Sequence, residues 1–512
     1  MSLKSSFFSW YFKKRWPEME AQIRLADDVQ QATLMSLVGD AKNTEIGKQY
    51  DFKSITRYED FQERVPIRDY EAIKPLIERT MRGEQNIIWH SDIRWFAKSS
   101  GTTSDKSKFI PVSFEALDKC HYQGGRDVLT MYCNSFQETE MFNGKSLVIG
   151  GSHKVNTFSE NSFYGDLSAV VLANTPFWVE FLRTPDKSIA LMEEWEEKLE
   201  KMALATVNED VTSISGVPTW TLVLIERLFE MTGKRDLHEI WPNLELYIHG
   251  GVSFTPYRER FQRLMPSRSI QYLESYNASE GFFGIQGDLG VHDMYLMPGY
   301  GIFFEFVKAE EIFDEYPKAI PLWEVEIGVN YAVVISTNAG LWRYIIGDTL
   351  KFTGVRPYRF QITGRTKLFI NAFGEELVIE NAERGIAKAC EATNAIVSDY
   401  TAAPVYMDEG AVAGHEWLIE FEQAPENELR FMEILDQTLK EVNSDYEAKR
   451  YKNMALQAPK LVSLERGSFR QWLRVRGKLG GQHKVPRLSN NRIIVEEILA
   501  LKNEHNQLIE PA

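Results

Sequence analysis

The chain has 512 residues, of which 44% are apolar and 26% charged, the proportions of an ordinary globular protein with room for two or three domains. Its formal net charge of −15 means that the surface as a whole repels nucleic acid and anionic lipid. If the protein binds a polyanion, it must do so through a local cluster of cations. Three widely spaced cysteines exclude a disulfide framework and indicate a reducing compartment.

The start of the sequence, MSLKSSFFSWYFKKRWPEME, shows no targeting signal. It has an apolar patch but no uninterrupted apolar run and no small-residue cleavage site. Elsewhere no apolar run approaches the roughly 20 residues that cross a bilayer. We therefore expect a cytoplasmic protein that binds neither nucleic acid nor membrane.

Helical periodicity dominates residues 18 to 85, as in ATLMSLVGDAK and YEAIKPLIERTM. From about residue 94, short β-rich runs alternate with helical segments, and Pro218 stands where the first turn of a helix tolerates proline. The runs are KFIPV, KSLVIGG, LELYIHGG, SIQYLESY, GIFFEFV and YAVVIST. Strands that alternate with helices predict a large α/β region with sheets flanked by helices.

The pattern of predicted helices and strands changes after about residue 360. EELVIENAERGIAKAC and ENELRFMEILDQTLKEV read as helices and EWLIEFE as a strand, followed by SFRQWLRVRGKLG and NRIIVEEILALKN. These segments predict a smaller α+β domain. We expect a large N-terminal domain at 1–364 and a small C-terminal domain at 365–512, joined by a short hinge.

The decamer SSGTTSDKSK at residues 99 to 108 is the first candidate site. Ser and Thr hydroxyls and glycine-freed backbone N–H groups form concavities that bind phosphate, and Lys106 and Lys108 would neutralise its charge. A solvated connection between two strands uses the same residue types. The loop is not a GxxxxGK[ST] loop, because no glycine–lysine pair closes it.

Two further motifs follow predicted strands. In SYNASEGFFG, Glu280 is suited to Mg²⁺ and Tyr276 to stacking on a purine, although a buried turn with a capping glutamate also fits. In LWRYIIGDTLKFTG, Asp348 follows Gly347 at the end of a β run and would accept hydrogen bonds from vicinal ribose hydroxyls. A Gly-Asp hairpin turn is the alternative.

The remaining candidates are weaker by themselves. Arg365 and Lys367 flank the predicted domain boundary, and Lys484 lies in the glycine-rich stretch GKLGGQHKVPRLS, where a solvent-exposed lysine is the simple alternative. The helix EALDKCHYQGGRDVLTMY follows the first loop and carries Tyr122 and Arg126 as candidate substrate contacts. A structural role for both residues is the alternative.

Taken in order, the motifs resemble those of the adenylate-forming superfamily, which includes acyl-CoA synthetases, peptide-synthetase adenylation domains and luciferases. Within it the chain most resembles the plant auxin-responsive acyl acid–amido synthetases and their bacterial relatives. This resemblance also covers the framing segments DFKSITRYEDFQERVPIRDYEAIKPLIERTMRGE, LYIHGGVSF and QHKVPRL, and runs through nearly the whole chain.

The resemblance implies a role for each matching residue. The phosphate loop would consist of Ser99, Ser100, Gly101, Thr102, Thr103 and Lys108. Gly250 and Gly251 would leave room for the adenine, with Tyr276 packed on its other face.

The same resemblance implies the catalytic residues Glu280, Arg365 and Lys484. Ser279 and Glu280 would meet the α-phosphate and Mg²⁺, and Asp348 would hold the ribose hydroxyls. Arg365 and Lys367 would mark the hinge of a mobile small domain, which would deliver Lys484 to the acyl carboxylate and the α-phosphate.

The implied activity is an ATP-dependent ligation. A carboxylic acid would be adenylated, and its acyl group would pass to an amine, by resemblance that of an amino acid, with release of AMP and pyrophosphate. The helix after the first loop would line the acyl pocket, and Tyr122 or Arg126 would contact the acid. An acyl-CoA synthetase and a non-catalytic adenylate-binding protein are the alternatives. We expect ATP and Mg²⁺ as cofactors, small-molecule substrates and a monomer.

Overall fold

The computed structural model describes the chain apart from residue 1 and residues 101–106, 151–154, 160, 176, 193, 253, 255–256, 267–269, 289, 367–368, 407–412, 454, 477–484 and 510–512. The chain forms two compact units, each considered by itself. The N-terminal unit comprises Met1–Ser99, Lys108–Gly251 and Phe261–Thr366, and the C-terminal unit comprises Ser100–Ser107, Val252–Arg260 and Lys367–Ala512.

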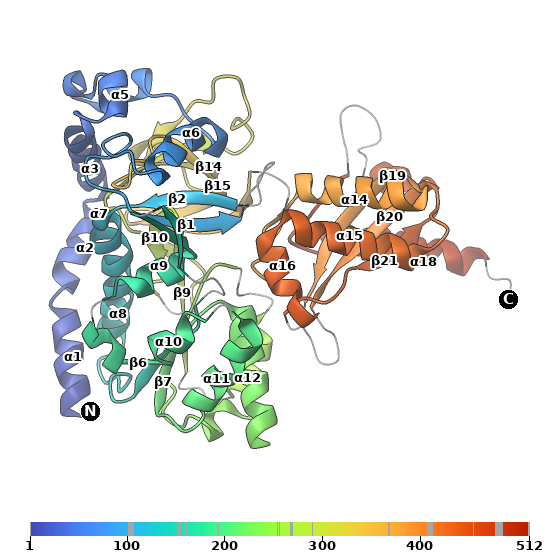
Figure 1. Ribbon diagram of the computed structural model, residues 1–512, viewed down its shortest axis with the longest axis horizontal. Helices are drawn as coiled ribbons and strands as arrows, with labels where there is room; N and C mark the ends of the chain where they lie inside the picture. The colour runs from blue at the N-terminus through green and yellow to red at the C-terminus, as the bar shows by residue number, and fades with distance from the viewer. Residues whose placement is uncertain are drawn as a thin grey trace. The chain divides into compact units, whose positions relative to one another are not determined.

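Helices open the N-terminal unit, as the sequence predicts. They are α1 (Leu3–Lys13), α2 (Trp16–Arg24), α3 (Ala26–Ala41), α4 (Glu45–Gln49), α5 (Tyr58–Arg64) and α6 (Tyr70–Met81). The helix predicted for YEAIKPLIERTM is α6, and it begins where the Asp69 side chain accepts a hydrogen bond from the Ala72 backbone N–H. Helices α1, α2 and α3 line one edge of the unit (Figure 1).

A 12-stranded sheet forms the centre of this unit, in the order β13-β12-β14-β15-β16-β11-β10-β9-β8-β7-β3-β6. The run from β9 to β6 is parallel and the remaining pairs are antiparallel. The strands are β3 (Lys145–Val148), β6 (Arg183–Thr184), β7 (Val211–Ser215), β8 (Leu246–His249), β9 (Gln271–Ala278), β10 (Gly281–Ile285), β11 (Met294–Leu296), β12 (Ile302–Lys308), β13 (Ile320–Pro321), β14 (Asn330–Thr337), β15 (Tyr344–Val355) and β16 (Tyr358–Arg365).

A second sheet of four strands has the order β2-β1-β5-β4. Its strands are β1 (Trp95–Ser100), β2 (Ser107–Val112), β4 (Asn156–Ser159) and β5 (Ser162–Gly165). The decamer at 99–108 therefore connects two neighbouring strands, and its residues 101 to 106 lie outside the described part of the chain.

Helices follow or connect the strands in this unit, as expected for an α/β region. They include α7 (Phe114–Ala116), the π-helix η2 (Leu117–Tyr122), α8 (Gln123–Ser135), α9 (Leu167–Ala173), α10 (Lys187–Ala190), α11 (Trp195–Thr206), α12 (Pro218–Thr232) and the last four residues of α13 (Arg258–Leu264). Pro218 is the first residue of α12, as predicted.

The C-terminal unit contains the three-stranded sheet β19-β20-β21 and the pair β17-β18. Helices α14 and α15 lie side by side along it (Figure 1). Leu418 of β20 and Leu464 of β21 belong to a buried cluster with Trp472 of α17 and Ile498 of α18. The elements are β17 (Phe369–Ile370), β18 (Leu377–Val378), α14 (Ile379–Thr393), β19 (Ile396–Val405), β20 (Gly414–Gln423), α15 (Glu428–Val442), α16 (Ser444–Arg450), β21 (Lys460–Leu464), α17 (Ser468–Val475) and α18 (Ile493–Ile509).

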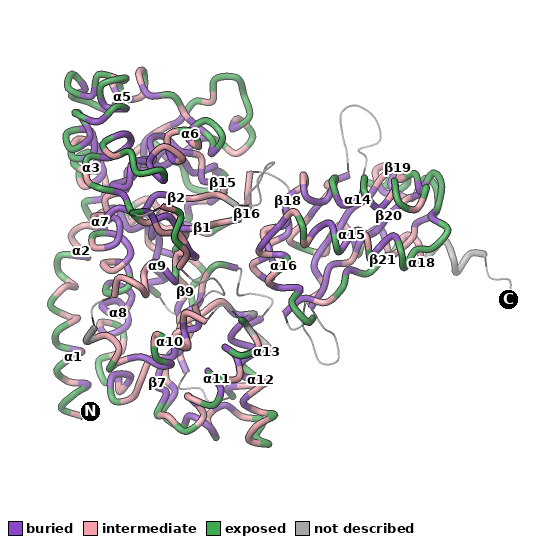
Figure 2. The backbone as a smooth tube through the Cα atoms, viewed as in Figure 1, coloured by how far each residue is buried: buried purple, intermediate pink, exposed green. Residues whose placement is uncertain are grey.

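Burial follows the strands in both units (Figure 2). In β14 every residue after the first is buried, which is typical of a strand covered on both faces. Within the described residues, no helix combines the length and the apolar character needed to cross a membrane.

Candidate active site

Asp348 lies in a bulge of β15. Its strand pairs with β14 through Thr349 opposite Ala332 and Ile345 opposite Val334, so three residues of β15 stand against one of β14. Gly347, within this bulge, has φ = +93°, which glycine adopts without strain. The sequence predicted a strand end or a hairpin turn, and both were wrong. The strand continues to Val355, because the extra residues are absorbed in the bulge.

The bulge directs Asp348 toward two partners. Across the β15–β16 pair it faces Arg365, whose Nε donates to Asp348 Oδ1 at 2.7 Å. The Tyr276 hydroxyl donates to Asp348 Oδ2. Burial, followed by the negative charge of Asp348, raises the pKa of Tyr276 well above its ordinary value, so this phenol stays protonated. Three residues from separate predicted motifs therefore form one hydrogen-bonded group.

Glu280 lies beside this group, in the two-residue turn Ser279–Glu280 that joins β9 to β10. Its side chain is half-buried, and burial raises the pKa of its carboxyl to about 7. The charges of Lys108 and Arg365 lower this pKa, and the charge of Asp348 raises it. Glu280 therefore shares one electrostatic environment with a cation from the first motif and the Asp348–Arg365 pair.

Lys108 is held at the start of β2 by an aromatic neighbour. Its Nζ lies 5.7 Å from the centre of the Tyr70 ring, and the Tyr70 hydroxyl accepts a hydrogen bond of 2.8 Å from the Phe109 backbone N–H. A cation of the predicted phosphate loop is thereby fixed at the edge of the four-stranded sheet.

Tyr344 completes this environment. It is fully buried, and its hydroxyl has no hydrogen-bond partner among the described residues. Burial and the nearby charge of Glu280 raise the pKa of Tyr344 well above its ordinary value. The phenol is thus a protonated donor beside a carboxylate.

The two glycines predicted to leave room for adenine follow β8. A Cβ on Gly250 would stand 2.3 Å from the Ser275 carbonyl oxygen, and Gly251 has φ = +81°. Both positions thus require glycine because of the backbone itself. They lie at the carboxyl end of a parallel strand, the edge where open α/β sheets bind ligands.

In the part of the chain that the structure describes, no group of three or more His, Cys, Asp or Glu side chains is arranged to hold a metal ion. Glu280 by itself suits Mg²⁺, which proteins commonly bind through one or two carboxylates together with substrate phosphates. The residues present therefore fit a metal that arrives with a nucleotide.

Family models match three consecutive parts of the chain. The GH3 family N-terminal domain matches residues 15–270, the GH3 family central domain matches 295–365, and the GH3 family C-terminal domain matches 380–493. The chain belongs to the GH3 family.

Curated GH3 relatives span nearly the full chain. Indole-3-acetic acid-amido synthetase GH3.3 of Arabidopsis thaliana is 23% identical and covers 93% of this chain and 92% of its own length. Jasmonoyl–L-amino acid synthetase JAR4 of Nicotiana attenuata is 24% identical, with 92% of both chains covered. By their names, both relatives are synthetases that join a carboxylic acid to an amine.

Solved structures share the fold. A GH3.15 acyl acid amido synthetase in complex with 2,4-DB has a TM-score of 0.63 at 17% identity, covering 96% of both chains. A 2-hydroxyisobutyryl-CoA ligase in complex with 2-HIB-AMP and CoA has a TM-score of 0.54 at 12% identity, covering 94% of this chain and 92% of its own. The predicted architecture, a large α/β part followed by a smaller α+β part, is therefore confirmed.

Several predicted site residues of this GH3 chain fall outside the described residues. These are Gly101, Thr102, Thr103, Lys367 and Lys484. Ser99 and Ser100 end β1, directly before the loop. The structure brings Lys108, Tyr276, Glu280, Asp348 and Arg365 together, with Ser279 beside Glu280 in the turn.

The two predicted acyl contacts have partners of their own. The Tyr122 hydroxyl donates to the Val171 carbonyl at 3.0 Å. Arg126 is 51% exposed in its side chain, and its Nη2 lies 3.7 Å from Asp118 Oδ1. These contacts fit the structural alternative that the sequence left open, and the acyl contacts stay a prediction.

Sequence reasoning missed Tyr70 and Tyr344. The motif Tyr-x-x-Gly-Asp contains Tyr344, so its position four residues before Asp348 was a signal. Tyr70 carries no such signal, because it lies in a helix 38 residues before Lys108 in sequence and meets it only through packing.

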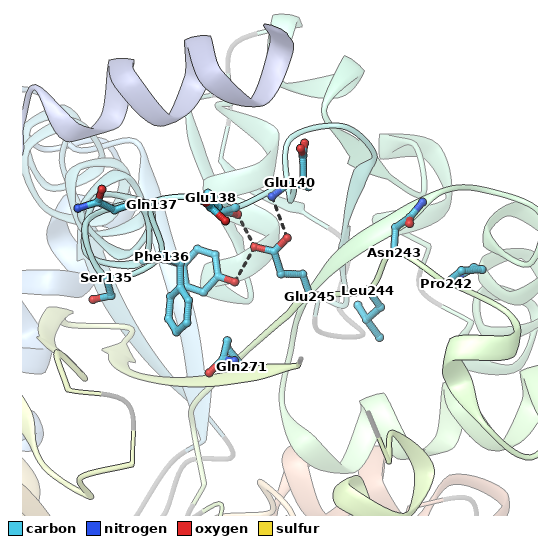
Figure 3. A pocket seen from close by; sticks show the side chains of 12 residues that line it. Ser135, Phe136, Gln137, Glu138, Glu140, Pro242, Asn243, Leu244, Glu245 and Gln271 are labelled. Carbon is cyan, nitrogen blue, oxygen red and sulfur yellow. Dashed lines mark hydrogen bonds between the residues drawn. The ribbon is translucent and has the colours of Figure 1, made fainter. Parts of the chain in front are cut away.

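A cavity of about 620 Å³ lies elsewhere in the N-terminal unit (Figure 3). Its centre is Glu245, which accepts hydrogen bonds from the Tyr132 and Thr139 hydroxyls and the Glu140 backbone N–H. Glu245 precedes β8 and Gln271 begins β9, so the cavity lies at the amino ends of these parallel strands. The predicted site is at their carboxyl ends, and this cavity is separate from it.

Proposed function

We propose that this chain is an ATP-dependent acyl acid–amido synthetase. It adenylates a carboxylic acid and transfers the acyl group to the amine of an amino acid, with release of AMP and pyrophosphate. The observation that carries the proposal is the single environment shared by Lys108, Glu280, Tyr276, Asp348 and Arg365 in a chain of the GH3 family.

The chemistry requires fixed positive charge. A carboxylate is a poor electrophile because its leaving group would be an oxide, whereas an acyl-adenylate releases AMP. Forming the adenylate brings the carboxylate and the α-phosphate together, and both are anions. Lys108 and the late lysine Lys484 would stabilise the negative charge that develops at phosphorus.

The carboxylates have different tasks in this proposal. Asp348 accepts hydrogen bonds from the ribose hydroxyls, and Arg365 and Tyr276 keep its two oxygens oriented. Glu280 holds Mg²⁺ together with the phosphates, and the metal when bound neutralises phosphate charge. The protonated Tyr344 phenol has no hydrogen-bond partner among the described residues, and it would donate to a group that binds beside Glu280.

A hinge separates the two half-reactions in the proposal. Lys484 is needed only while the adenylate forms, so a rotation of the segment 365–512 relative to 1–364 removes it and admits the amine. Arg365 is the last residue of β16, and the last segment of the C-terminal unit begins two residues later, at Lys367. The participants are ATP, Mg²⁺ and small molecules, and we infer a cytoplasmic monomer.

A panel of acceptors tests the activity. The purified chain is incubated with ATP, Mg²⁺ and a pool of carboxylic acids, together with either the proteinogenic amino acids or coenzyme A, and AMP is measured. The proposal expects AMP release that needs both an acid and an amino acid. Release with coenzyme A alone would identify an acyl-CoA synthetase, and no pyrophosphate release with any acid would favour an adenylate-binding protein.

A further inference from the structure

Helix α1 has one face committed to the rest of the N-terminal unit. Ser5 and Ser9 are buried, and the small side chains allow the helix to approach α8 closely. Phe8 and Phe12 stack on Phe142, with ring centres 5.4 Å and 5.5 Å apart. This packing fixes the orientation of the helix about its own axis.

The opposite face of α1 is apolar and exposed to solvent. Leu3, Phe7, Trp10 and Tyr11 are 91%, 58%, 54% and 53% exposed. Their spacing of i, i+4, i+7 and i+8 places them in one stripe along the helix. We call these four residues the outer stripe. Figure 2 shows exposed positions recurring along α1. Exposed apolar side chains grouped in this way mark a surface that another body covers.

Positive charge surrounds the outer stripe. Lys4 and Lys14 are exposed, and Lys14 Nζ lies 3.5 Å from the centre of the Trp10 ring. Lys13 is half-buried at the end of the same helix, and residues 2 to 17 include no Asp or Glu. In a chain with a net charge of −15, this segment is a local cluster of cations of the kind that an acidic protein needs to meet an anionic surface.

We propose that the outer stripe docks α1 on an anionic lipid membrane surface, in contrast to the expectation from the net charge that the protein binds no membrane. Tryptophan and tyrosine favour the headgroup region because each has an apolar ring and a polar edge. The lysines reach anionic headgroups while their stems cover apolar surface. The helix would lie in the plane of the interface, with the Ser5–Ser9 face still packed on the protein.

A second copy of this chain fits the outer stripe less well. Pairing two α1 helices in parallel brings each lysine against its equivalent, and antiparallel pairing brings Lys4 against Lys14. Either arrangement places like charges in contact with no acid of α1 to compensate. An anionic surface offers the complementary charge.

The contact is expected to be reversible. Four apolar side chains and three lysines supply a modest affinity, and the electrostatic part is screened over about 10 Å at 0.1 M salt. Binding should therefore require anionic lipid and weaken with salt.

Vesicle flotation of the full chain tests the proposal. The vesicles are phosphatidylcholine alone or with one quarter phosphatidylserine. We expect the chain to float only with the anionic vesicles, and 0.5 M NaCl to reduce the bound fraction. Phe7→Ser with Trp10→Ser should lower it about tenfold, because the anchoring rings are lost. Lys13→Gln with Lys14→Gln should lower it as well.

Phe313→Ser with Tyr316→Ser is the matched control. These aromatics are 66% and 85% exposed in the same unit, within the acidic segment AEEIFDEYPK, and their removal should leave flotation unchanged. The substituted aromatics and Lys14 are exposed and Lys13 is half-buried, so each variant should keep its thermal midpoint within about 3 °C.

Four results would overturn the proposal. They are failure of the chain to float with anionic vesicles, equal flotation with both vesicle types, equal loss in the Phe313/Tyr316 control, and a dimer in solution that the Phe7/Trp10 variant converts to a monomer. The last result would assign the outer stripe to a second copy of the chain.

Discussion

Asp348 and Arg365 face each other across β15 and β16, and Arg365 Nε donates to Asp348 Oδ1 at 2.7 Å. Tyr276 donates to the second carboxylate oxygen. Arg365 is also the last residue of β16, and the N-terminal unit ends one residue later at Thr366. The carboxylate that we assign to the ribose is therefore oriented by a residue next to the proposed hinge.

Asp348→Asn should weaken nucleotide binding. The amide retains the size of the side chain, but it has no negative charge and only one oxygen that accepts hydrogen bonds from the ribose and from Arg365. KM for ATP should therefore rise about 10- to 100-fold. The control is Arg359→Gln, which breaks an ion pair between β16 and Asp288 away from the site. An unchanged KM for ATP in Asp348→Asn would remove this residue from the nucleotide site.

Lys484→Ala should impair adenylation while ATP binding changes little. Loss of one charge-stabilising group lowers such a step about 10²- to 10³-fold. Pyrophosphate exchange measures the step, and Lys388→Ala is the matched control, because Lys388 forms an exposed ion pair with Glu441 in the same unit. Exchange at the wild-type rate in Lys484→Ala would refute the assignment.

Gly250→Ala should destabilise the chain even without nucleotide. The new Cβ would stand 2.3 Å from the Ser275 carbonyl oxygen, and relieving that overlap costs about 1–3 kcal/mol of unfolding free energy. Gly39→Ala in α3 is the control, because its Cβ meets nothing within 4 Å and should stabilise the helix. Chemical denaturation of the nucleotide-free protein compares the two. A Gly250→Ala variant as stable as wild type would contradict this prediction, because it would mean that the backbone around Ser275 moves to accept the Cβ at no cost in stability.

His121 should make stability depend on pH below neutrality. Burial lowers its pKa to about 4, while the unfolded chain has the ordinary value of 6.5. Between pH 4 and pH 6.5, His121 is therefore protonated in the unfolded state and neutral in the folded state. The stability from neutral His121 is therefore complete above pH 6.5 and is lost as pH falls toward 4.

The test compares wild type with His121→Gln by denaturation at several pH values. The His121 contribution should amount to about 3 kcal/mol across the window, and the variant should lack it. Because other groups titrate equally in both proteins, only the difference is informative. Parallel pH profiles for the two proteins would contradict the prediction.

Arg343→Met should be strongly destabilising. Arg343 Nη2 lies 2.9 Å from Glu305 Oε1, both side chains are buried, and the same guanidinium donates to the Val65 carbonyl at 2.7 Å. Removing it leaves the Glu305 charge uncompensated, at a cost of about 3–5 kcal/mol. Adding Glu305→Leu should recover part of the loss, and a double variant as unstable as the sum of the single variants would contradict this account.

Most elements followed from local patterns. The helix α6 and the strands β8, β9, β12 and β14 lie where the sequence predicts them. Apolar residues at helical spacing indicate a helix, and short runs of apolar, β-branched and aromatic residues indicate strands. The continuation of the parallel run β9-β8-β7-β3-β6 into an antiparallel sheet carries no such signal. Pairing partners distant in sequence determine it.

The site was predictable as motifs and less so as geometry. Gly347 and Asp348 suit a turn and a bulge equally well, and only pairing with β14 and β16 decides between them. Gly250 was assigned to make room for adenine, yet its Cβ would also meet the Ser275 backbone. Tertiary contacts supply what the sequence leaves open in both cases.

The central claim is that the chain activates a carboxylic acid as its adenylate, and isotope exchange between labelled pyrophosphate and ATP measures this step directly. The reaction contains Mg²⁺ and a pool of carboxylic acids but no amine or thiol. We predict exchange that depends on an acid and stops when the acids are omitted. Absence of exchange with every acid, in a folded chain that binds ATP, would contradict the account.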